Sequence, residues 1–257
     1  MVLVSGAVAD KPARLVASSE PIELAGSPAP FVGRGGEKLH AALVRFGIDV
    51  RGGRALDAGA STGGFTDCLL QAGADSVVAV DVGHGQLHHR LRTDPRVTVL
   101  ERTDIRNISL ASLDHRPVDV VTADLSFISA VRVVPTLVGE VAVPGAPVIV
   151  LVKPQFEAGR AEVSRGKGVI RDPVLHRRAL GAVAEALESA GAVVVGAMPS
   201  PITGSAGNIE FLLHARRSDV GTSAVPIARD GPGAGGSDLA GRLDAAVAEA
   251  HAGDLRR

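Results

Sequence analysis

Polar side chains that could do chemistry follow several short apolar runs of this 257-residue chain. Lys153 comes directly after the apolar run 147–152 and precedes Pro154, which holds the chain extended. In an open α/β sheet, ligands bind beyond the carboxyl ends of the strands. A lone aspartate at such an end is more often a turn former or helix cap, but several in succession favour a ligand site. The aspartates that end or follow these runs are Asp57, Asp81, Asp104 and Asp124.

A glycine-rich turn at residues 57–67, DAGASTGGFTD, follows the first of these runs and precedes a helical pattern. Its glycines allow the backbone to approach a ligand, and the first amides of the helix face the same place. Asp57 would repel a pyrophosphate and attract a cationic sulfonium amino acid, which favours S-adenosylmethionine over NAD as cofactor. We expect Asp81 to bind the ribose hydroxyls and Asp104 the adenine amino group. The expected cofactor contacts are Asp57, Gly59, Ser61, Thr62, Gly63, Gly64, Phe65, Asp81, Thr103, Asp104 and Asp124.

Seven apolar runs are predicted to be the strands that position these residues. They alternate with helical patterns, which predicts an α/β fold with a Rossmann-like, doubly wound, mostly parallel seven-stranded sheet. A further helix at 37–46 precedes the first of these strands. The strands are expected at 54–57, 76–81, 97–101, 118–123, 147–152, 192–198 and 209–215, and the later helices at 65–72, 86–92, 130–141 and 173–190.

The composition narrows the class of protein. Hydrophobic residues make up 46% of the chain and include six Phe but neither Trp nor Tyr, so the core must be aliphatic. A net charge of −1 gives no overall nucleic-acid signature, so any such partner must be identified from local charge. The single cysteine, Cys68, is expected to be buried and unreactive, and its isolation suits a reducing cytoplasm. We expect no export signal and no membrane span, because the apolar run 141–152 is short and contains two prolines.

The chain divides into four segments by composition. Residues 1–25 alternate apolar and polar in short bursts and are too few to form a domain alone. Residues 26–32 form a linker that contains Gly and Pro, and residues 33–217 contain the strand and helix pattern. Residues 218–257 shift to Gly, Ser and Ala, which predicts a flexible, low-complexity tail with one short helix at 240–250.

Several motifs stand in order along the chain from Phe31 to Arg216. Besides the glycine-rich turn, they are RGGEKL at 34–39, DVG at 81–83, GQL at 85–87, ERT at 101–103, DLSFI at 124–128, VKPQFE at 152–157, GKGVIRD at 166–172 and PSPITGSAGNIE at 199–210. With these motifs the chain resembles the TlyA (haemolysin A) family of ribosomal-RNA ribose 2′-O-methyltransferases, within the FtsJ-type methyltransferase fold. The resemblance implies the sheet of the class I S-adenosylmethionine-dependent methyltransferases, whose last strand is antiparallel.

The resemblance also implies an activity, which is methyl transfer from S-adenosylmethionine to a ribose 2′-hydroxyl of ribosomal RNA. Cytidine is the usual target, and no metal is needed. Enzymes of this type use a Lys-Asp-Lys-Glu tetrad, which by motif falls on Lys38, Asp124, Lys153 and Glu210. Lys153 would take up or stabilise the charge of the departing proton, while Lys38 and Glu210 orient it and the ribose. Asp124 would face the sulfonium. Because the last strand begins at the edge where the others end, Glu210 can meet Lys153 and Asp124 there.

RNA binding is expected from local positive charge. Residues 153–178 contain seven Lys or Arg against three Asp or Glu, and they include a Gly-containing loop. A solvated charged loop is the alternative, but the position beside the proposed site suits contacts with the phosphates of ribosomal RNA or a ribosomal subunit. The expected RNA-binding residues are Arg34, Arg160, Arg165, Lys167 and Arg171.

Other features depart from the family pattern or admit another function. Family members usually begin with a complete S4 RNA-binding domain, whereas only something like its second half precedes the linker here, so either the start lies upstream or part of the module has been lost. A non-catalytic RNA-binding or ribosome-assembly protein could keep the same fold and cofactor pocket, although the intact tetrad argues against it. Residues 59–63 match the G-x-S-x-G motif of hydrolases, but the late histidine, His214, lies within a predicted strand. The sequence names neither the nucleotide, the subunit nor an oligomeric state.

Overall fold

The computed structural model describes residues 2–11, 13–25, 29–218 and 239–252. It separates the chain into two compact units, Met1–Pro30 and Phe31–Arg257. The first unit is a small antiparallel sheet in the order β2-β1-β3, formed by β1 (Val2–Val4), β2 (Ala7–Val8) and β3 (Ile22–Leu24). β1 and β2 form a hairpin, because Ser5 and Gly6 both have positive φ and form the two-residue turn that matches the twist of the flanking strands.

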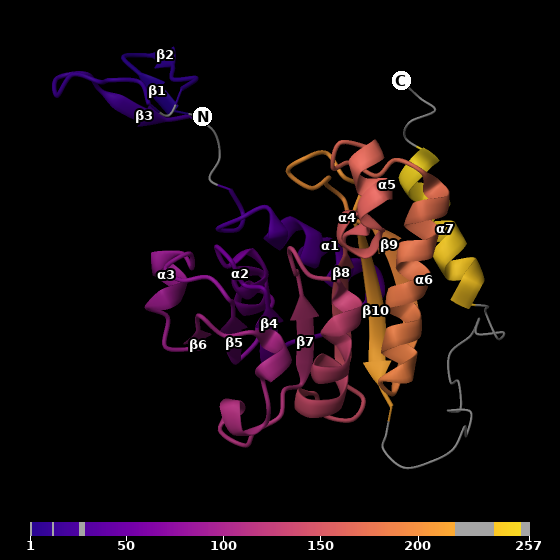
Figure 1. The fold of residues 1–257 in the computed structure, drawn as a ribbon. Helices are drawn as coiled ribbons and strands as arrows, with labels where there is room; N and C mark the ends of the chain where they lie inside the picture. The colour runs from indigo at the N-terminus through magenta and orange to yellow at the C-terminus, as the bar shows by residue number, and fades with distance from the viewer. Residues whose placement is uncertain (1, 12, 26–28, 219–238, 253–257) are drawn as a thin grey trace. The chain divides into compact units, whose positions relative to one another are not determined.

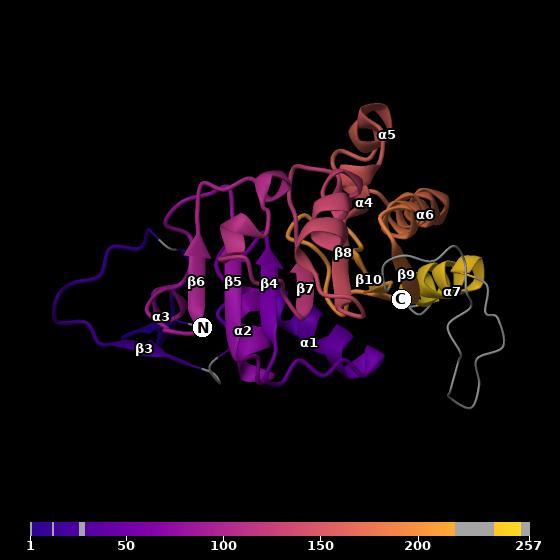
Figure 2. The same cartoon turned by 90° about the horizontal axis from the view of Figure 1, so that it is seen from below.

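The second unit is built on a seven-stranded sheet in the order β6-β5-β4-β7-β8-β10-β9 (Figures 1 and 2). The paired strands are parallel except at β10, which is antiparallel to both β8 and β9, so the predicted sheet is confirmed. Most of its inner strands are rich in Val, Ile or Leu, as expected where helices cover both faces of a sheet. The strands are β4 (Arg54–Ala58), β5 (Ser76–Val80), β6 (Val97–Leu100), β7 (Val120–Ala123), β8 (Pro147–Val152), β9 (Ala192–Pro199) and β10 (Phe211–Arg217).

Helices pack on both faces of this sheet (Figure 2). One face is covered by α1 (Gly35–Phe46) and α2 (Gly64–Gln71), and the other by α6 (Pro173–Ser189) with the short turns before β8. The remaining helices are α3 (His89–Arg92), α4 (Pro154–Glu157), α5 (Arg160–Arg165) and α7 (Leu239–Ala252). Across the residues that the structure describes, every helix is too short or too polar to cross a membrane.

The helix expected at 130–141 is broken in two. A 3₁₀ turn at Ala130–Arg132 and a π-helical turn at Thr136–Val141 replace it. Pro135 caps the second turn and lacks the N–H that a continuous helix would use there, which explains the break. Both turns still bury their apolar side chains, so the predicted amphipathic pattern is correct although the geometry is not.

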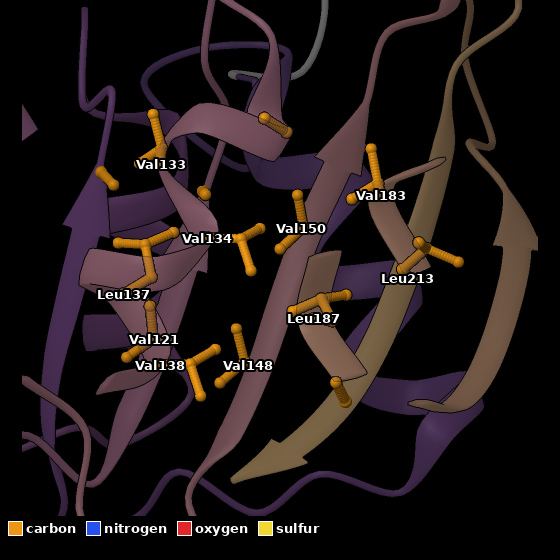
Figure 3. Packing of buried hydrophobic residues seen from close by; sticks show 14 of the residues in the cluster. Val121, Val133, Val134, Leu137, Val138, Val148, Val150, Val183, Leu187 and Leu213 are labelled. Carbon is orange, nitrogen blue, oxygen red and sulfur yellow. The ribbon is translucent and has the colours of Figure 1, made fainter. Parts of the chain in front are cut away.

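The core is aliphatic, as the composition requires. Figure 3 shows the interdigitated valines and leucines beneath α6 and the two turns, among them Val134, Leu137, Val150 and Leu213. Cys68 is buried on the opposite face, where burial raises the pKa of its thiol to about 12. A thiol with such a pKa is protonated at neutral pH, in agreement with the predicted unreactive role.

The C-terminal segment contains the short helix that the sequence predicts at 240–250. Within it, α7 is a regular helix that packs against β9 and α6 and buries Leu243, Ala246 and Val247. Two ion pairs fasten it, from Arg45 of α1 to Glu249 and from Arg177 of α6 to Asp244. Apolar residues spaced three and four apart give this helix one apolar face, which explains the packing. Its many alanines favour a helix and let it lie close against its neighbours. The Gly-rich run 231–236 lies outside the described residues.

Candidate active site

The glycine-rich turn connects β4 to α2 and approaches the end of β7 closely. Gly59 has a φ of +86°, and a Cβ there would lie 2.5 Å from the backbone oxygen of Asp124. Gly64 begins α2, where a Cβ would lie 2.9 Å from the backbone nitrogen of Gly36 in α1. These two positions therefore need glycine, because the turn, the end of β7 and the start of α1 meet without room for side chains. Gly63 is the N-cap of α2, with a φ of 100°.

A cavity of about 590 Å³ lies at the ends of β4, β5 and β7, and we call it the strand-end cavity. Asp81 lies at its edge, where its two carboxylate oxygens accept hydrogen bonds from the backbone N–H groups of Ser61 (2.8 Å) and Gly83 (2.7 Å). These bonds fix the carboxylate orientation and leave lone pairs for hydroxyl donors. The sequence-predicted residues that line this cavity are Gly59, Ser61, Asp81, Thr103, Asp104 and Asp124.

A second cavity of about 340 Å³, which we call the lysine cavity, lies between α1, the glycine-rich turn and the start of β10. It shares Gly59, Ser61, Asp124 and Ser126 with the strand-end cavity, so the two spaces adjoin. All four tetrad residues line it, as do Arg34, Thr62, Gly64 and Phe65. The structure thus brings together residues that are up to 172 positions apart in the chain.

The register of the sheet explains how two of these residues meet. Phe211 at the start of β10 pairs with Val152 at the end of β8, so the preceding Glu210 and the following Lys153 lie at the same edge. This is the placement that the antiparallel last strand predicts. The ion-pair partner of Glu210 is different from the expected one, however, because its carboxylate accepts from Lys38 Nζ of α1 at 2.5 Å. The side chains of this pair are 9% and 3% exposed, so each charge depends on the other.

Lys153 forms the second ion pair of the site. Its Nζ lies 2.6 Å from Oδ1 of Asp124 and donates a hydrogen bond to Ser126 Oγ at 2.8 Å. The side chains of Lys153 and Asp124 are 11% and 20% exposed, so this pair is more open than that of Lys38. Ser126 was not among the predicted site residues, although the DLSFI motif contains it. Its position two residues after the strand-end aspartate is the signal that could have identified it.

Phe156 lies beside Lys153, and Phe127 lies next to Phe156 and lines the strand-end cavity. The ring of Phe127 is 93% exposed, and its φ of +66° is rare for a residue with a bulky side chain. Its ring centroid lies 5.6 Å from that of Phe156, and Lys153 Nζ lies 6.0 Å from the Phe156 centroid. An exposed aromatic ring in a strained backbone conformation indicates a functional constraint, since burial does not repay its cost. Neither phenylalanine was predicted as a site residue, although the DLSFI and VKPQFE motifs contain them.

The position of Asp57 differs from its predicted contact with the cofactor. Its side chain is fully buried and lines neither cavity, since it points from β4 toward α2, where Thr66 Oγ1 donates to its Oδ2 at 2.6 Å. Burial, with smaller contributions from Asp124 and Asp81, raises its pKa to about 7. A direct contact with a cofactor is therefore ruled out in this arrangement. Asp57 sits beneath the turn, and only its charge can act on the site.

Asp104 also differs from its predicted role as an open acceptor. Its carboxylate caps the 3₁₀ turn Ile105–Asn107 and is bound by the guanidinium and the backbone N–H of Arg106. The hydrogen bonds from Arg106 lower the pKa of Asp104 to about 2, so it is ionised. Because Arg106 occupies both oxygens, an adenine amino group would have to share them. Arg106 lines the same cavity and was not predicted.

The predicted RNA-binding residues fall into two places. Arg34 lines the lysine cavity and donates to the backbone oxygen of Thr203, which joins the start of α1 to the loop before β10. The other four follow α4, with Arg160 and Arg165 in α5 and Lys167 and Arg171 in the loop after it. Arg165, Lys167 and Arg171 are exposed. We call residues 166–171 the basic loop.

The described residues contain no cluster of His, Cys, Asp and Glu suited to a metal. The site therefore consists of two adjoining cavities, of which one has a carboxylate oriented for hydroxyl donors and the other holds two lysine–carboxylate pairs. With the sheet order and its single antiparallel strand, this arrangement defines an α/β methyltransferase fold.

Comparisons with known proteins agree. The FtsJ-like methyltransferase model matches residues 31–217, and the chain belongs to that family. It is 48% identical over 216 residues to the 16S/23S rRNA (cytidine-2′-O)-methyltransferase TlyA of Mycobacterium tuberculosis, covering 84% of this chain and 80% of the relative. A solved hemolysin-like protein from Streptococcus thermophilus has a TM-score of 0.81 at 36% identity and covers 99% of this chain and 87% of the other.

More distant proteins share the fold alone. A solved S-adenosylmethionine-dependent methyltransferase from Mesorhizobium loti has a TM-score of 0.51 at 19% identity, with 69% of this chain and 96% of the other covered. The sheet predicted from the strand and helix pattern is therefore the methyltransferase sheet.

Proposed function

We propose that this protein transfers a methyl group from S-adenosylmethionine to a ribose 2′-hydroxyl of ribosomal RNA, with cytidine as the target nucleotide. The observation that supports it most is Lys153, which Asp124 and Ser126 hold where the two cavities adjoin. The relative from Mycobacterium tuberculosis is named as an rRNA (cytidine-2′-O)-methyltransferase. The solved protein from Streptococcus thermophilus shares the whole fold.

The strand-end cavity has the features that S-adenosylmethionine requires. Gly59 lets the turn lie close against the end of β7, and Asp81 presents oriented oxygens for ribose hydroxyls. Asp57 lies buried below the turn, and a cation bound above the turn would favour its ionised form. When bound, the cofactor supplies a methyl group on a positively charged sulfur.

Lys153 has an N–H donor available for the reacting hydroxyl. An ammonium group has three N–H donors; the hydrogen bond to Ser126 uses one, and Asp124 holds the group by charge. A remaining donor can bind the ribose 2′-oxygen and stabilise the negative charge that develops as the hydroxyl proton passes to water. Asp124 and Ser126 fix the direction of that donor, so most of the rate comes from positioning.

The pair of Lys38 and Glu210 lines the same cavity as Lys153. Glu210 has a second carboxylate oxygen and Lys38 further N–H donors, so the pair can accept from and donate to ribose hydroxyls on either side of the reacting atom. Its burial keeps the pair in one geometry, which suits orientation better than proton transfer.

RNA would reach the lysine cavity across the basic loop and the two phenylalanines. Exposed Arg165, Lys167 and Arg171 supply positive charge for phosphates. Phe127 lines the strand-end cavity and offers an exposed ring face, next to Phe156, on which an unstacked base can rest. The small sheet of the first unit would add RNA contacts as part of an S4-type module.

The test is methyl transfer from labelled S-adenosylmethionine to purified ribosomal subunits by wild-type protein and by Lys153→Ala. We expect labelled RNA with the wild type and none with Lys153→Ala, while both bind S-adenosylmethionine in calorimetry. Lys153→Arg serves as the matched control because it keeps the charge but changes the donor geometry, and we expect it to remain strongly impaired. Subunit binding by the wild type without label would contradict the proposal and support a non-catalytic assembly protein.

A further inference from the structure

Ile170, in the basic loop, is held by two buried side chains from different parts of the chain. Its backbone N–H donates to Asn208 Oδ1 at 2.9 Å, and its carbonyl oxygen lies 3.1 Å from His176 Nε2. Asn208 and His176 are 2% and 0% exposed, and neither lines the strand-end or the lysine cavity. Both backbone groups of one loop residue are thus paired by side chains that the catalytic arrangement leaves unexplained.

These bonds restrict a segment that would otherwise be loose. The loop has glycines at 166 and 168, with Lys167 between them at a φ of +51°. Asn208 also donates through Nδ2 to the carbonyl of Gly168 at 2.9 Å, so it holds the loop at two points. Glycine-containing segments lose the most conformational freedom on ordering, and the buried bonds to Asn208 and His176 offset that loss.

Asn208 also connects the loop to the tetrad. It stands two residues before Glu210, whose carboxylate pairs with Lys38. Its own backbone carbonyl accepts from the N–H of Gly204, which lines the lysine cavity. One side chain therefore fixes the basic loop relative to the wall of the cavity.

His176 extends the support to the C-terminal helix. A carbonyl oxygen only accepts, so His176 Nε2 must carry the hydrogen that bonds Ile170, and Nδ1 of the neutral ring is an acceptor. His251 of α7 lies 3.0 Å away through Nε2 and must then donate to that Nδ1. Burial lowers the pKa of His176, which favours the neutral ring. The chain of bonds runs from α7 through α6 to the loop.

We propose that His176 and Asn208 are positioning residues, which hold the basic loop where its charges meet the phosphates of the RNA substrate, with α7 as support through His251. The proposal rests on the proposed function, since it assigns the loop to RNA. It predicts that loosening Ile170 weakens RNA binding and leaves cofactor binding intact.

The test compares His176→Phe with His176→Gln. Phenylalanine keeps a flat ring against Phe211 but removes the bond to Ile170, whereas the Nε2 of glutamine can still donate to that carbonyl. His89→Ala, an exposed histidine on α3, is the matched control. For each protein we would measure KM for ribosomal subunits, kcat, affinity for S-adenosylmethionine, and amide exchange at Ile170 and at Val150 of β8.

We expect His176→Phe to raise KM for RNA about tenfold, the effect of leaving one buried carbonyl without its partner. Its kcat at saturating RNA and its cofactor affinity should be retained, because the change removes substrate binding only. Exchange should accelerate at Ile170 and not at Val150, and His176→Gln should restore both KM and exchange.

An unchanged KM in His176→Phe, a rise shared by His89→Ala, or no rescue by His176→Gln would overturn the proposal. Equal loss of cofactor binding would also overturn it, since that result indicates general destabilisation. If the wild type methylates no RNA, the proposed function fails, and the positioning role is then decided by RNA affinity and amide exchange alone.

Discussion

Replacing Asp57 with asparagine tests the burial of that carboxyl, because the change removes the ionisable group and nearly keeps its shape. Burial raises the pKa of Asp57 from 3.8 to about 7. The folded protein therefore holds a proton that the unfolded chain releases, and its free energy of unfolding falls as pH rises through this window. A shift of about three units corresponds to about 4 kcal/mol in total, of which about 2.5 kcal/mol falls between pH 5 and pH 8.

Urea denaturation at pH 5, 6, 7 and 8, followed by far-ultraviolet circular dichroism because the chain has no Trp, measures this dependence. We expect the stability of Asp57→Asn relative to wild type to increase by about 2.5 kcal/mol across that range. The pKa values of His176 and His214 are lowered by burial, so they act in the opposite sense, but they cancel in the difference. An asparagine N–H without a partner would cost stability equally at every pH.

Asp75→Asn is the matched control, because Asp75 is an exposed carboxyl just before β5. Its stability should follow the wild-type pH dependence. Parallel curves for Asp57→Asn and wild type would refute the reasoning, since they would show that the carboxyl of Asp57 is ionised throughout the range in the folded protein.

Three further substitutions test other parts of the site. Ser126→Ala removes an acceptor of Lys153 and should lower the single-turnover rate about tenfold while cofactor affinity in calorimetry is retained; an unchanged rate would contradict the role of Ser126. Gly59→Ala places a Cβ 2.5 Å from a backbone oxygen at a φ of +86°, so thermal unfolding should show a loss of about 1–3 kcal/mol and cofactor binding should weaken; wild-type values for both would contradict the close approach. Phe127→Ala should raise KM for RNA about tenfold without lowering the melting temperature, because the ring is 93% exposed; an unchanged KM would exclude stacking there.

Local sequence patterns predicted the sheet because most of its strands are short apolar runs bounded by turn formers. The parallel topology predicted the edge of the sheet at which the polar residues gather. The resemblance to the methyltransferase family predicted the tetrad. Lys153 was also identifiable from its neighbours alone, since a lysine directly after a buried strand is hard to solvate. These features depend on periodicity and order along the chain.

Other features depend on contacts between distant segments. Asp57 and Asp81 both follow short apolar runs, yet one points under α2 and the other lines a cavity, and nothing in the sequence separates them. The pairing of Glu210 with Lys38, instead of Lys153, depends on how α1 lies against β10. The helix predicted at 240–250 is confirmed as α7, but its packing on β9 could not be predicted, because small residues suit both an exposed helix and one packed closely on a sheet.

The measurement closest to the central claim is the chemical position of the transferred methyl group. Ribosomal subunits are incubated with S-adenosylmethionine and the protein, their RNA is digested to nucleosides, and the products are separated by liquid chromatography and mass spectrometry. The account predicts a gain in 2′-O-methylcytidine with the wild type and none with Lys153→Ala. Methylation of a base, or equal 2′-O-methylation by both proteins, would contradict it.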